Sequence, residues 1–103
     1  MYYIFEVTAR PGYTIDQYAK AWVAASELIQ QTCGAKGTRL CRKIGDNRSA
    51  LAIAEWENKL ARDDSTNQIS GEAQGIISSQ IDFVDIRFIG EYEAPDWTVL
   101  PPS

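Results

Sequence analysis

Ala50-Leu51-Ala52-Ile53-Ala54-Glu55-Trp56 is the stretch that decides the fold of this chain. Small and larger residues alternate along it, which is the period of a β-strand whose side chains point to alternate faces. Neither face has the polarity of a solvated edge, so the pattern predicts a central strand. One face carries Ala50, Ala52, Ala54 and Trp56, and the other carries Leu51, Ile53 and Glu55.

The alanine row beside Trp56 leaves two interpretations open. The small residues could form the wall of a recess that the indole closes at one end, which would suit a ligand. Alternatively, they allow helices to pack closely on the strand while Trp56 fills the core.

The residues before this strand predict a hairpin, a helix and a further strand. Gly45-Asp46-Asn47-Arg48 is a strong turn sequence, so residues 38–44 are expected to form an edge strand that pairs with the central one. Thr14 and Gln17 have the spacing of a capping box, and apolar residues then recur at helical spacing, which predicts a helix over residues 15–32. Residues 2–9 alternate as a first strand.

The residues after Trp56 predict a second helix and a last strand. Residues 57–64 are polar and favour a short helical turn, and apolar spacing predicts the second main helix over residues 68–79. Residues 81–89 alternate as a strand. The remaining residues contain three prolines and Trp97, which favour an extended tail. We therefore expect one domain over residues 1–90 and a tail over residues 91–103.

The order strand, helix, strand, strand, helix, strand is the ferredoxin-like α+β pattern. Right-handed crossovers place both helices on one face of a four-stranded antiparallel sheet. The helix-facing set is then Tyr3, Phe5, Val7, Ala52, Ala54, Trp56, Val84, Ile86 and Phe88. The open face carries Tyr2, Ile4, Glu6, Leu51, Ile53, Glu55, Phe83, Asp85, Arg87 and Ile89.

The open face is too apolar for water, because it would expose several large side chains as one patch. We therefore expect a homodimer built through this face, in which the charged side chains pair with each other. The extended tail fits the same arrangement, since Trp97 needs a groove that the partner could supply.

Composition excludes several classes of function. The 103 residues have a net charge of −4 and scattered basic residues, which disfavours nucleic-acid binding. With no histidine and two cysteines, Cys33 and Cys41, we expect no metal, haem or flavin site and two free, mostly buried thiols. No stretch is long enough to cross a bilayer and no leader precedes the first strand, so a cytoplasmic protein is expected.

Three short motifs resemble the antibiotic biosynthesis monooxygenase family of the dimeric α+β barrel superfamily. They are Arg10-Pro11-Gly12, Gly34-Ala35-Lys36-Gly37 and Ala54-Glu55-Trp56-Glu57. The resemblance implies sheet-to-sheet dimers and, in several members, oxidation of aromatic polyketides by oxygen without metal or flavin. A related branch degrades haem with an Asn, a Trp and a His. Trp56 matches its Trp, but the other two residues have no counterpart here.

Two sets of residues are candidates for chemistry. Tyr18 and Trp22, one turn apart on the first helix, could enclose a flat aromatic ligand together with Trp56, or the three could be a core cluster. Arg87 could hold a phenolate and Glu6 or Glu55 could accept a proton, or these charges could be ion pairs in the dimer interface. The charged set lies on the opposite sheet face from Trp56.

Three functions therefore remain open. They are a cofactor-independent monooxygenase acting on a small aromatic molecule, a non-catalytic small-molecule binder, and a dimerisation module.

Overall fold

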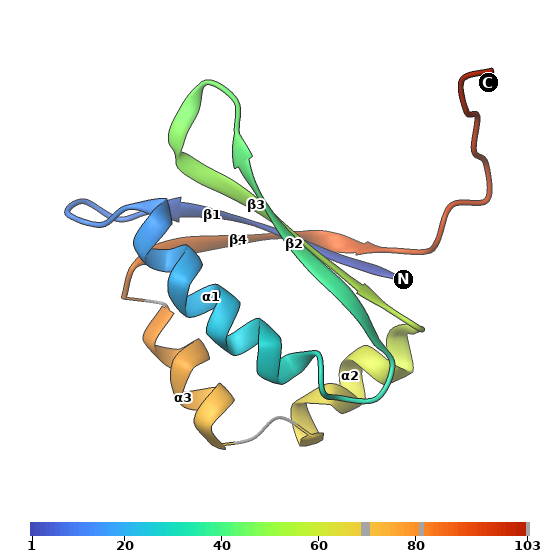
Figure 1. Cartoon of the computed structure of the whole chain (residues 1–103), viewed down its shortest axis with the longest axis horizontal. Helices are drawn as coiled ribbons and strands as arrows, with labels where there is room; N and C mark the ends of the chain where they lie inside the picture. The colour runs from blue at the N-terminus through green and yellow to red at the C-terminus, as the bar shows by residue number, and fades with distance from the viewer. Residues whose placement is uncertain (69–70, 81, 103) are drawn as a thin grey trace.

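The computed structural model describes residues 1–68, 71–80 and 82–102, which form one four-stranded antiparallel sheet and three helices. All three helices lie on the same side of the sheet (Figure 1). The strand order β2-β3-β1-β4 confirms the predicted α+β, ferredoxin-like arrangement with the Ala50–Trp56 stretch in a central strand. The elements are β1 (Tyr2–Ala9), α1 (Ile15–Ile29), β2 (Ala35–Lys43), β3 (Asp46–Trp56), α2 (Lys59–Gln68), α3 (Gly71–Gln80) and β4 (Val84–Tyr92).

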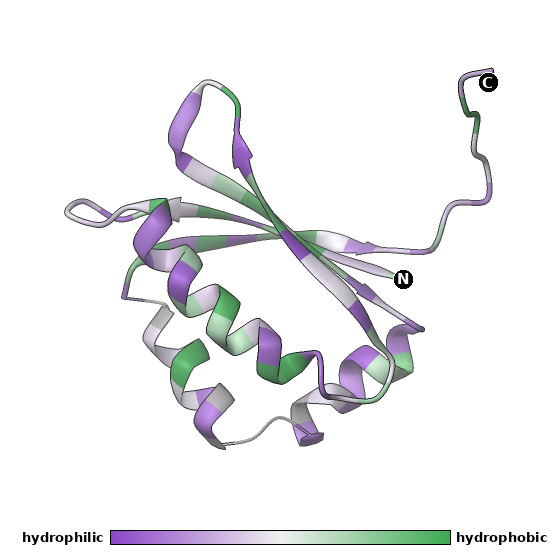
Figure 2. Cartoon of the chain, viewed as in Figure 1, coloured by the Kyte–Doolittle hydropathy of each residue, from purple (hydrophilic) through white to green (hydrophobic). Residues whose placement is uncertain are grey.

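Strand β3 pairs with β1 on one side and β2 on the other, and this register fixes the two sheet faces. Phe5 lies opposite Ala52 and Val7 lies opposite Ala50, both pairs on the helix-facing side. Ile4 and Ile53 are paired on the open side. Figure 2 shows the resulting alternation of apolar and polar positions along the strands.

The packed core lies at one end of the sheet, beneath the first turns of α1. Its centre is Val7 and Tyr18, both with no exposed surface, and Ile15 closes it from the start of the helix. The other buried members of this cluster are Ala9, Ala50 and Val84. The opposite end of the helix-facing side is less filled, and that difference creates the site described below.

The capping box predicted at the start of α1 is present. The amide of Gln17 donates to the hydroxyl of Thr14 at 3.1 Å, and the amide of Thr14 donates to the Gln17 side-chain oxygen at 2.9 Å. The helix ends at Ile29, three residues before the predicted 32, because Thr32 turns back and its hydroxyl donates to the carbonyl of Ile29 at 2.7 Å.

We expect Thr14→Ala to lower the free energy of unfolding by about 1 kcal/mol, because the helix then loses its side-chain cap. Urea denaturation followed by circular dichroism measures the change. Thr98→Ala, in the exposed tail, is the matched control and should leave the unfolding midpoint unchanged. An equal effect of the two substitutions would contradict a stabilising role for the cap.

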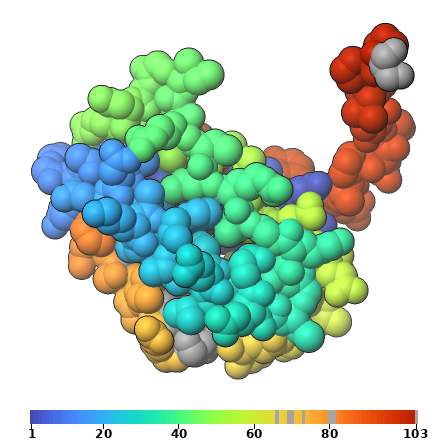
Figure 3. Space-filling model, viewed as in Figure 1, coloured from blue at the N-terminus to red at the C-terminus, as the bar shows by residue number. Residues whose placement is uncertain are grey.

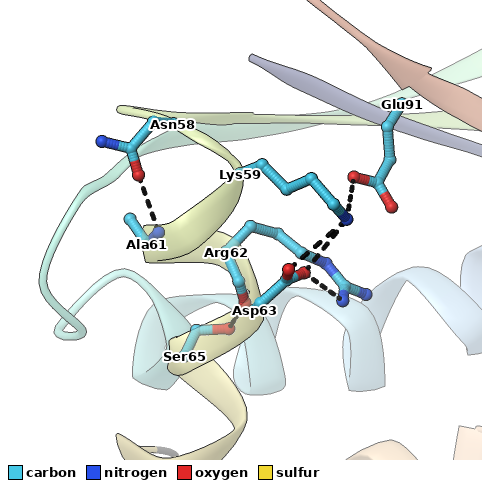
Figure 4. Close-up of polar contacts among 7 residues, drawn as sticks. All are labelled: Asn58, Lys59, Ala61, Arg62, Asp63, Ser65 and Glu91. Atoms are coloured by element: carbon cyan, nitrogen blue, oxygen red, sulfur yellow. Dashed lines mark hydrogen bonds and ion pairs between the residues drawn. The ribbon is translucent and has the colours of Figure 1, made fainter.

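The segment between β3 and β4 holds two helices rather than a helical turn and one main helix. Helix α2 is longer than the predicted turn over residues 57–64, because the side chain of Asn58 accepts from the amide of Ala61 at 2.8 Å and starts a regular helix (Figure 4). Helix α3 corresponds to most of the predicted helix 68–79. Residues 69–70 of that prediction lie outside the described residues.

The last strand begins and ends later than the predicted 81–89, and residue 81 lies outside the described residues. The prediction that Phe83 lies on the open face is wrong: Phe83 precedes β4 and packs on Tyr13, with ring centroids 5.1 Å apart. A β-bulge between Ile4 and Phe5 shifts the pairing, so that Gly90 lies opposite Ile4 and the strand continues into the predicted tail.

Two other sequence expectations differ from the structure. The hairpin strands run further than predicted, with Lys43 paired to Asp46, so the connection is shorter than the Gly45–Arg48 turn sequence suggested. Cys33 and Cys41 are exposed rather than mostly buried, because one follows α1 in a loop and the other lies on the edge strand β2.

The chain beyond β4 extends away from the body of the molecule (Figures 1 and 3). Trp97 is 89% exposed, and Val99 and Leu100 are also exposed. Among the helices of the described residues, none combines the length and the apolar character needed to cross a membrane.

Candidate functional site

A cavity of about 310 Å³ lies between the helix-facing side of the sheet and the three helices. The strands contribute Tyr3, Phe5, Thr38, Ala54, Trp56 and Ile86 to its wall. The helices contribute Tyr18, Trp22, Ala25, Ser26 and Ile29 from α1, Arg62 and Ser65 from α2, and Ile77 from α3, and Gln30 lines the cavity directly after α1. This volume is at the lower end of the range for small-molecule pockets.

The three aromatic residues named as candidate substrate-binding residues all line this cavity. Tyr18 and Trp22 come from α1, and Trp56, only 5% exposed, comes from the end of β3. Tyr3 and Phe5 add two further rings, with centroids 6.1 Å apart and an edge-to-face arrangement. The structure thus brings the rings together around a space, although a role in binding substrate stays a prediction.

The alanine row divides between the packed core and the cavity. Ala50 and Ala52 are 1% exposed and lie in the closely packed part of the fold. Ala54 lines the cavity, and its neighbours in register, Tyr3 and Thr38, line it too. Part of this row is therefore closely packed and part borders a space, and the use of that space by a ligand stays a prediction.

Tyr18 forms the boundary between the core and the cavity. Its ring belongs to the core cluster, yet its hydroxyl has no hydrogen-bond partner among the residues that the structure describes. Burial raises the pKa of Tyr18 to about 12, because the phenolate would lose its hydration. At neutral pH the side chain is therefore a neutral phenol that can donate a hydrogen bond.

Arg62 supplies positive charge to the cavity wall. Its guanidinium carbon lies 4.1 Å from the centroid of the Tyr3 ring, which is cation–π geometry, and its side chain is 29% exposed. Asp63 forms an ion pair with the Arg62 guanidinium, with 3.6 Å between nitrogen and oxygen, and a second one with Lys59 at 3.4 Å. Lys59 also pairs with Glu91 at 3.0 Å (Figure 4). Among the described lining residues, Arg62 alone is charged.

Sequence reasoning did not single out Arg62. It falls in the polar segment after Trp56, where no motif or apolar spacing marks a particular side chain. The Arg62 side chain reaches the Tyr3 ring because α2 is a regular helix that holds residue 62 near β1. A short helical turn over residues 57–64 does not predict this contact.

The charged candidates named from the sequence lie on the opposite side of the sheet from Trp56. Arg87 pairs with Glu6 across β4 and β1, with 3.3 Å between nitrogen and oxygen. Glu55 lies on the same open side, opposite Tyr2. The structure does not bring Arg87, Glu6 or Glu55 together with Trp56, and the described residues that line the cavity include no carboxylate.

Metal ligands do not gather at this site. Within residues 1–68, 71–80 and 82–102, no group of three or more His, Cys, Asp or Glu side chains is placed to hold a metal ion. The chemistry available at the cavity wall is that of aromatic rings, hydroxyl groups, the Gln30 carboxamide and one guanidinium.

The fold is shared with several solved proteins. SnoaB, a cofactor-independent oxygenase from Streptomyces nogalater, superposes with a TM-score of 0.72 at 11% identity, over 92% of this chain and 96% of SnoaB. The PA3566 protein of Pseudomonas aeruginosa gives 0.71 at 15% identity, over 91% of this chain and 93% of that protein. A structure described as an antibiotic biosynthesis monooxygenase gives 0.69 at 15% identity, over 92% and 100% of the two chains.

These structural matches confirm the predicted resemblance to antibiotic biosynthesis monooxygenase-like proteins at the level of the fold. No protein-family model matches the sequence. No curated protein matches it either.

Proposed function

We propose that this protein is a cofactor-independent oxygenase that binds a small, flat aromatic molecule in the cavity between sheet and helices. The observation that carries the proposal is the cavity of about 310 Å³ walled by the rings of Tyr3, Trp22 and Trp56. Its shared fold with a cofactor-independent oxygenase supports the reaction class.

The proposed reaction converts an activated methylene of the substrate to a carbonyl, so that the methylene compound and one O₂ give a ketone and one water. The substrate itself supplies the electrons, because removal of its proton gives a carbanion that can reduce oxygen. The protein must keep the site dry and stabilise the anion. The aromatic walls keep the site dry, and the guanidinium of Arg62 stabilises the anion.

The test is oxygen consumption with anthrone, whose central methylene is acidic and whose three rings are flat. We expect the protein to accelerate oxygen uptake above the spontaneous rate and to yield anthraquinone in equal amount. Saturable binding without any acceleration would contradict the oxygenase proposal.

Arg62→Gln should lower the protein-catalysed rate with anthrone at least about tenfold, because the anion loses its cationic partner. The apparent pKa of the pH–rate profile should also rise, since the bound anion becomes less stable relative to the neutral substrate. Lys20→Gln, on an exposed position of α1, removes the same charge and is the control. Equal rates for the Arg62 variant and this control would contradict the assigned role.

A non-catalytic binding function is the second candidate, and one observation favours it. Carboxylates are the usual proton acceptors in a site without histidine, yet the described lining residues include none. A carrier or sensor of the same aromatic molecule would need only the walls and the polar groups. The anthrone experiment separates the two functions, because only the oxygenase consumes oxygen.

We also propose that the protein acts as a homodimer through the open face of its sheet. Helices cover one side only (Figure 1), and the other side carries Ile4, Leu51 and Ile53 on its two central strands. Burying a large apolar side chain contributes about 1.5–3 kcal/mol, so several of them from two copies favour association strongly. The Arg87–Glu6 pair then lies within the interface with its charges matched.

A further inference from the structure

The hydroxyl of Tyr18 is an unusual buried group. The residue has no exposed surface, and its hydroxyl is unpartnered within the described part of the chain. A buried hydroxyl without a hydrogen bond costs free energy, and native proteins almost always avoid this arrangement. A phenylalanine would fill the same space without that cost. The presence of the hydroxyl therefore suggests a hydrogen-bond partner from outside the chain.

The surroundings of Tyr18 show where such a partner can come from. The residues that pack with its ring in the core are Val7, Ile15 and other apolar side chains, which have no acceptor to offer. The remaining side of Tyr18 borders the cavity, next to Trp22. Within the described part of the chain no group bonds the hydroxyl, so the cavity that Tyr18 borders is the route by which a partner could reach it.

Two of the cavity's polar groups, the Tyr18 hydroxyl and the Arg62 guanidinium, lie toward opposite ends of the sheet. Tyr18 packs near Val7, at the core end, whereas Arg62 stacks on Tyr3. Val7 and Tyr3 belong to the same strand and are four positions apart, which corresponds to about 13 Å at about 3.3 Å per residue. A bound molecule thus meets a neutral donor at its inner end and a cation at its outer end.

We propose that Tyr18 donates a hydrogen bond to a carbonyl oxygen at the inner end of a flat apolar ligand, so that the site selects aromatic ketones over the matching hydrocarbons. This inference rests on the proposed function in one respect, namely that the cavity binds a small aromatic molecule. The raised pKa of Tyr18 is consistent with it, because the side chain remains a donor at any physiological pH.

The test uses two molecules of nearly the same shape, α-tetralone and tetralin, which differ by one carbonyl oxygen. Ligand-detected NMR titration gives a dissociation constant for each. The wild-type protein should bind α-tetralone about tenfold more tightly than tetralin, as one buried hydrogen bond implies. Tyr18→Phe should remove that preference by weakening α-tetralone alone.

The control variant is Tyr13→Phe, which removes the same hydroxyl from a tyrosine outside the cavity. It should bind both molecules as the wild type does. Thermal unfolding provides a second readout: Tyr18→Phe should leave the melting temperature unchanged or raise it, because the hydroxyl makes no bond within the described protein.

Each outcome bears on a different claim. Equal binding of the two molecules by the wild type, or equal weakening of both by Tyr18→Phe, overturns the role of the hydroxyl while leaving the cavity as a binding site. A marked fall in melting temperature on Tyr18→Phe also overturns it, because the hydroxyl would then have a structural partner. Failure of both molecules to bind the wild type overturns the proposed function itself.

Discussion

Ile53→Asp should convert the proposed homodimer into a monomer at micromolar concentration. Ile53 lies on the open sheet face between Ile4 of β1 and Arg39 of β2, so its side chain is central in the proposed interface. Burying one unpaired carboxylate there costs about 3–5 kcal/mol, which corresponds to an association about 10²–10⁴ times weaker. Light scattering coupled to size exclusion measures the change directly as a halved mass.

Val23→Asp is the matched control, because it places the same charge on an exposed position of α1, on the helix side of the molecule. It should keep the dimeric mass. A monomeric wild type, or an Ile53→Asp variant that remains fully dimeric, contradicts the proposed interface.

The two thiols provide an independent readout of the same interface. Cys41 lies opposite Leu51 on the open face, whereas Cys33 lies in the loop after α1. Both are exposed in the single chain, so a dimer through the sheet should shield Cys41 from an alkylating reagent and leave Cys33 reactive. Ile53→Asp should bring the alkylation rate of Cys41 up to that of Cys33. Equal rates in the wild type would contradict the shielding.

The sheet could be predicted from the sequence because a strand has a strict two-residue period. Once Trp56 and Ala54 are assigned to the helix side, Ile53 must face the other way, and the observed register agrees. The β-bulge near Gly90 could not be predicted, because it depends on how β4 meets β1. A Cβ at Gly90 would lie 3.1 Å from the Tyr92 ring, a close approach that no sequence pattern signals.

The helices after β3 were predicted less well for a physical reason. Helix α2 is mostly polar, so apolar spacing gives no indication of its length, and its start depends on a single cap from Asn58. Arg62 was missed as a consequence. The aromatic wall could be predicted because Tyr18 and Trp22 are four positions apart in the sequence, which places them one helical turn apart on the same helix face.

The hydroxyl of Tyr18 shows the limit of such reasoning. Spacing identifies the residue as inward-facing, but whether its oxygen has a partner depends on every side chain packed around it. Only the three-dimensional contacts show that these neighbours are apolar and that the cavity lies beside them.

Ala54→Phe should abolish ligand binding while the fold is kept. Ala54 lies in the cavity wall, between Tyr3 and Thr38 in register, so a phenyl group there enters the space a ligand needs. We expect the cavity of about 310 Å³ to accept the ring without displacement of the backbone. We expect binding of α-tetralone to weaken at least about a hundredfold, or about 2.8 kcal/mol. The melting temperature should be unchanged or higher, because filling a void adds contacts.

Leu60→Phe is the control for this substitution, because it adds a ring on an exposed position of α2 outside the cavity. It should leave α-tetralone binding unchanged, and the anthrone reaction should likewise continue in this variant and stop in Ala54→Phe. The two readouts together separate a blocked cavity from a general loss of structure, since only the first removes binding while circular dichroism and melting temperature are preserved. Full binding by a well-folded Ala54→Phe protein would place the ligand elsewhere and contradict the cavity as the functional site.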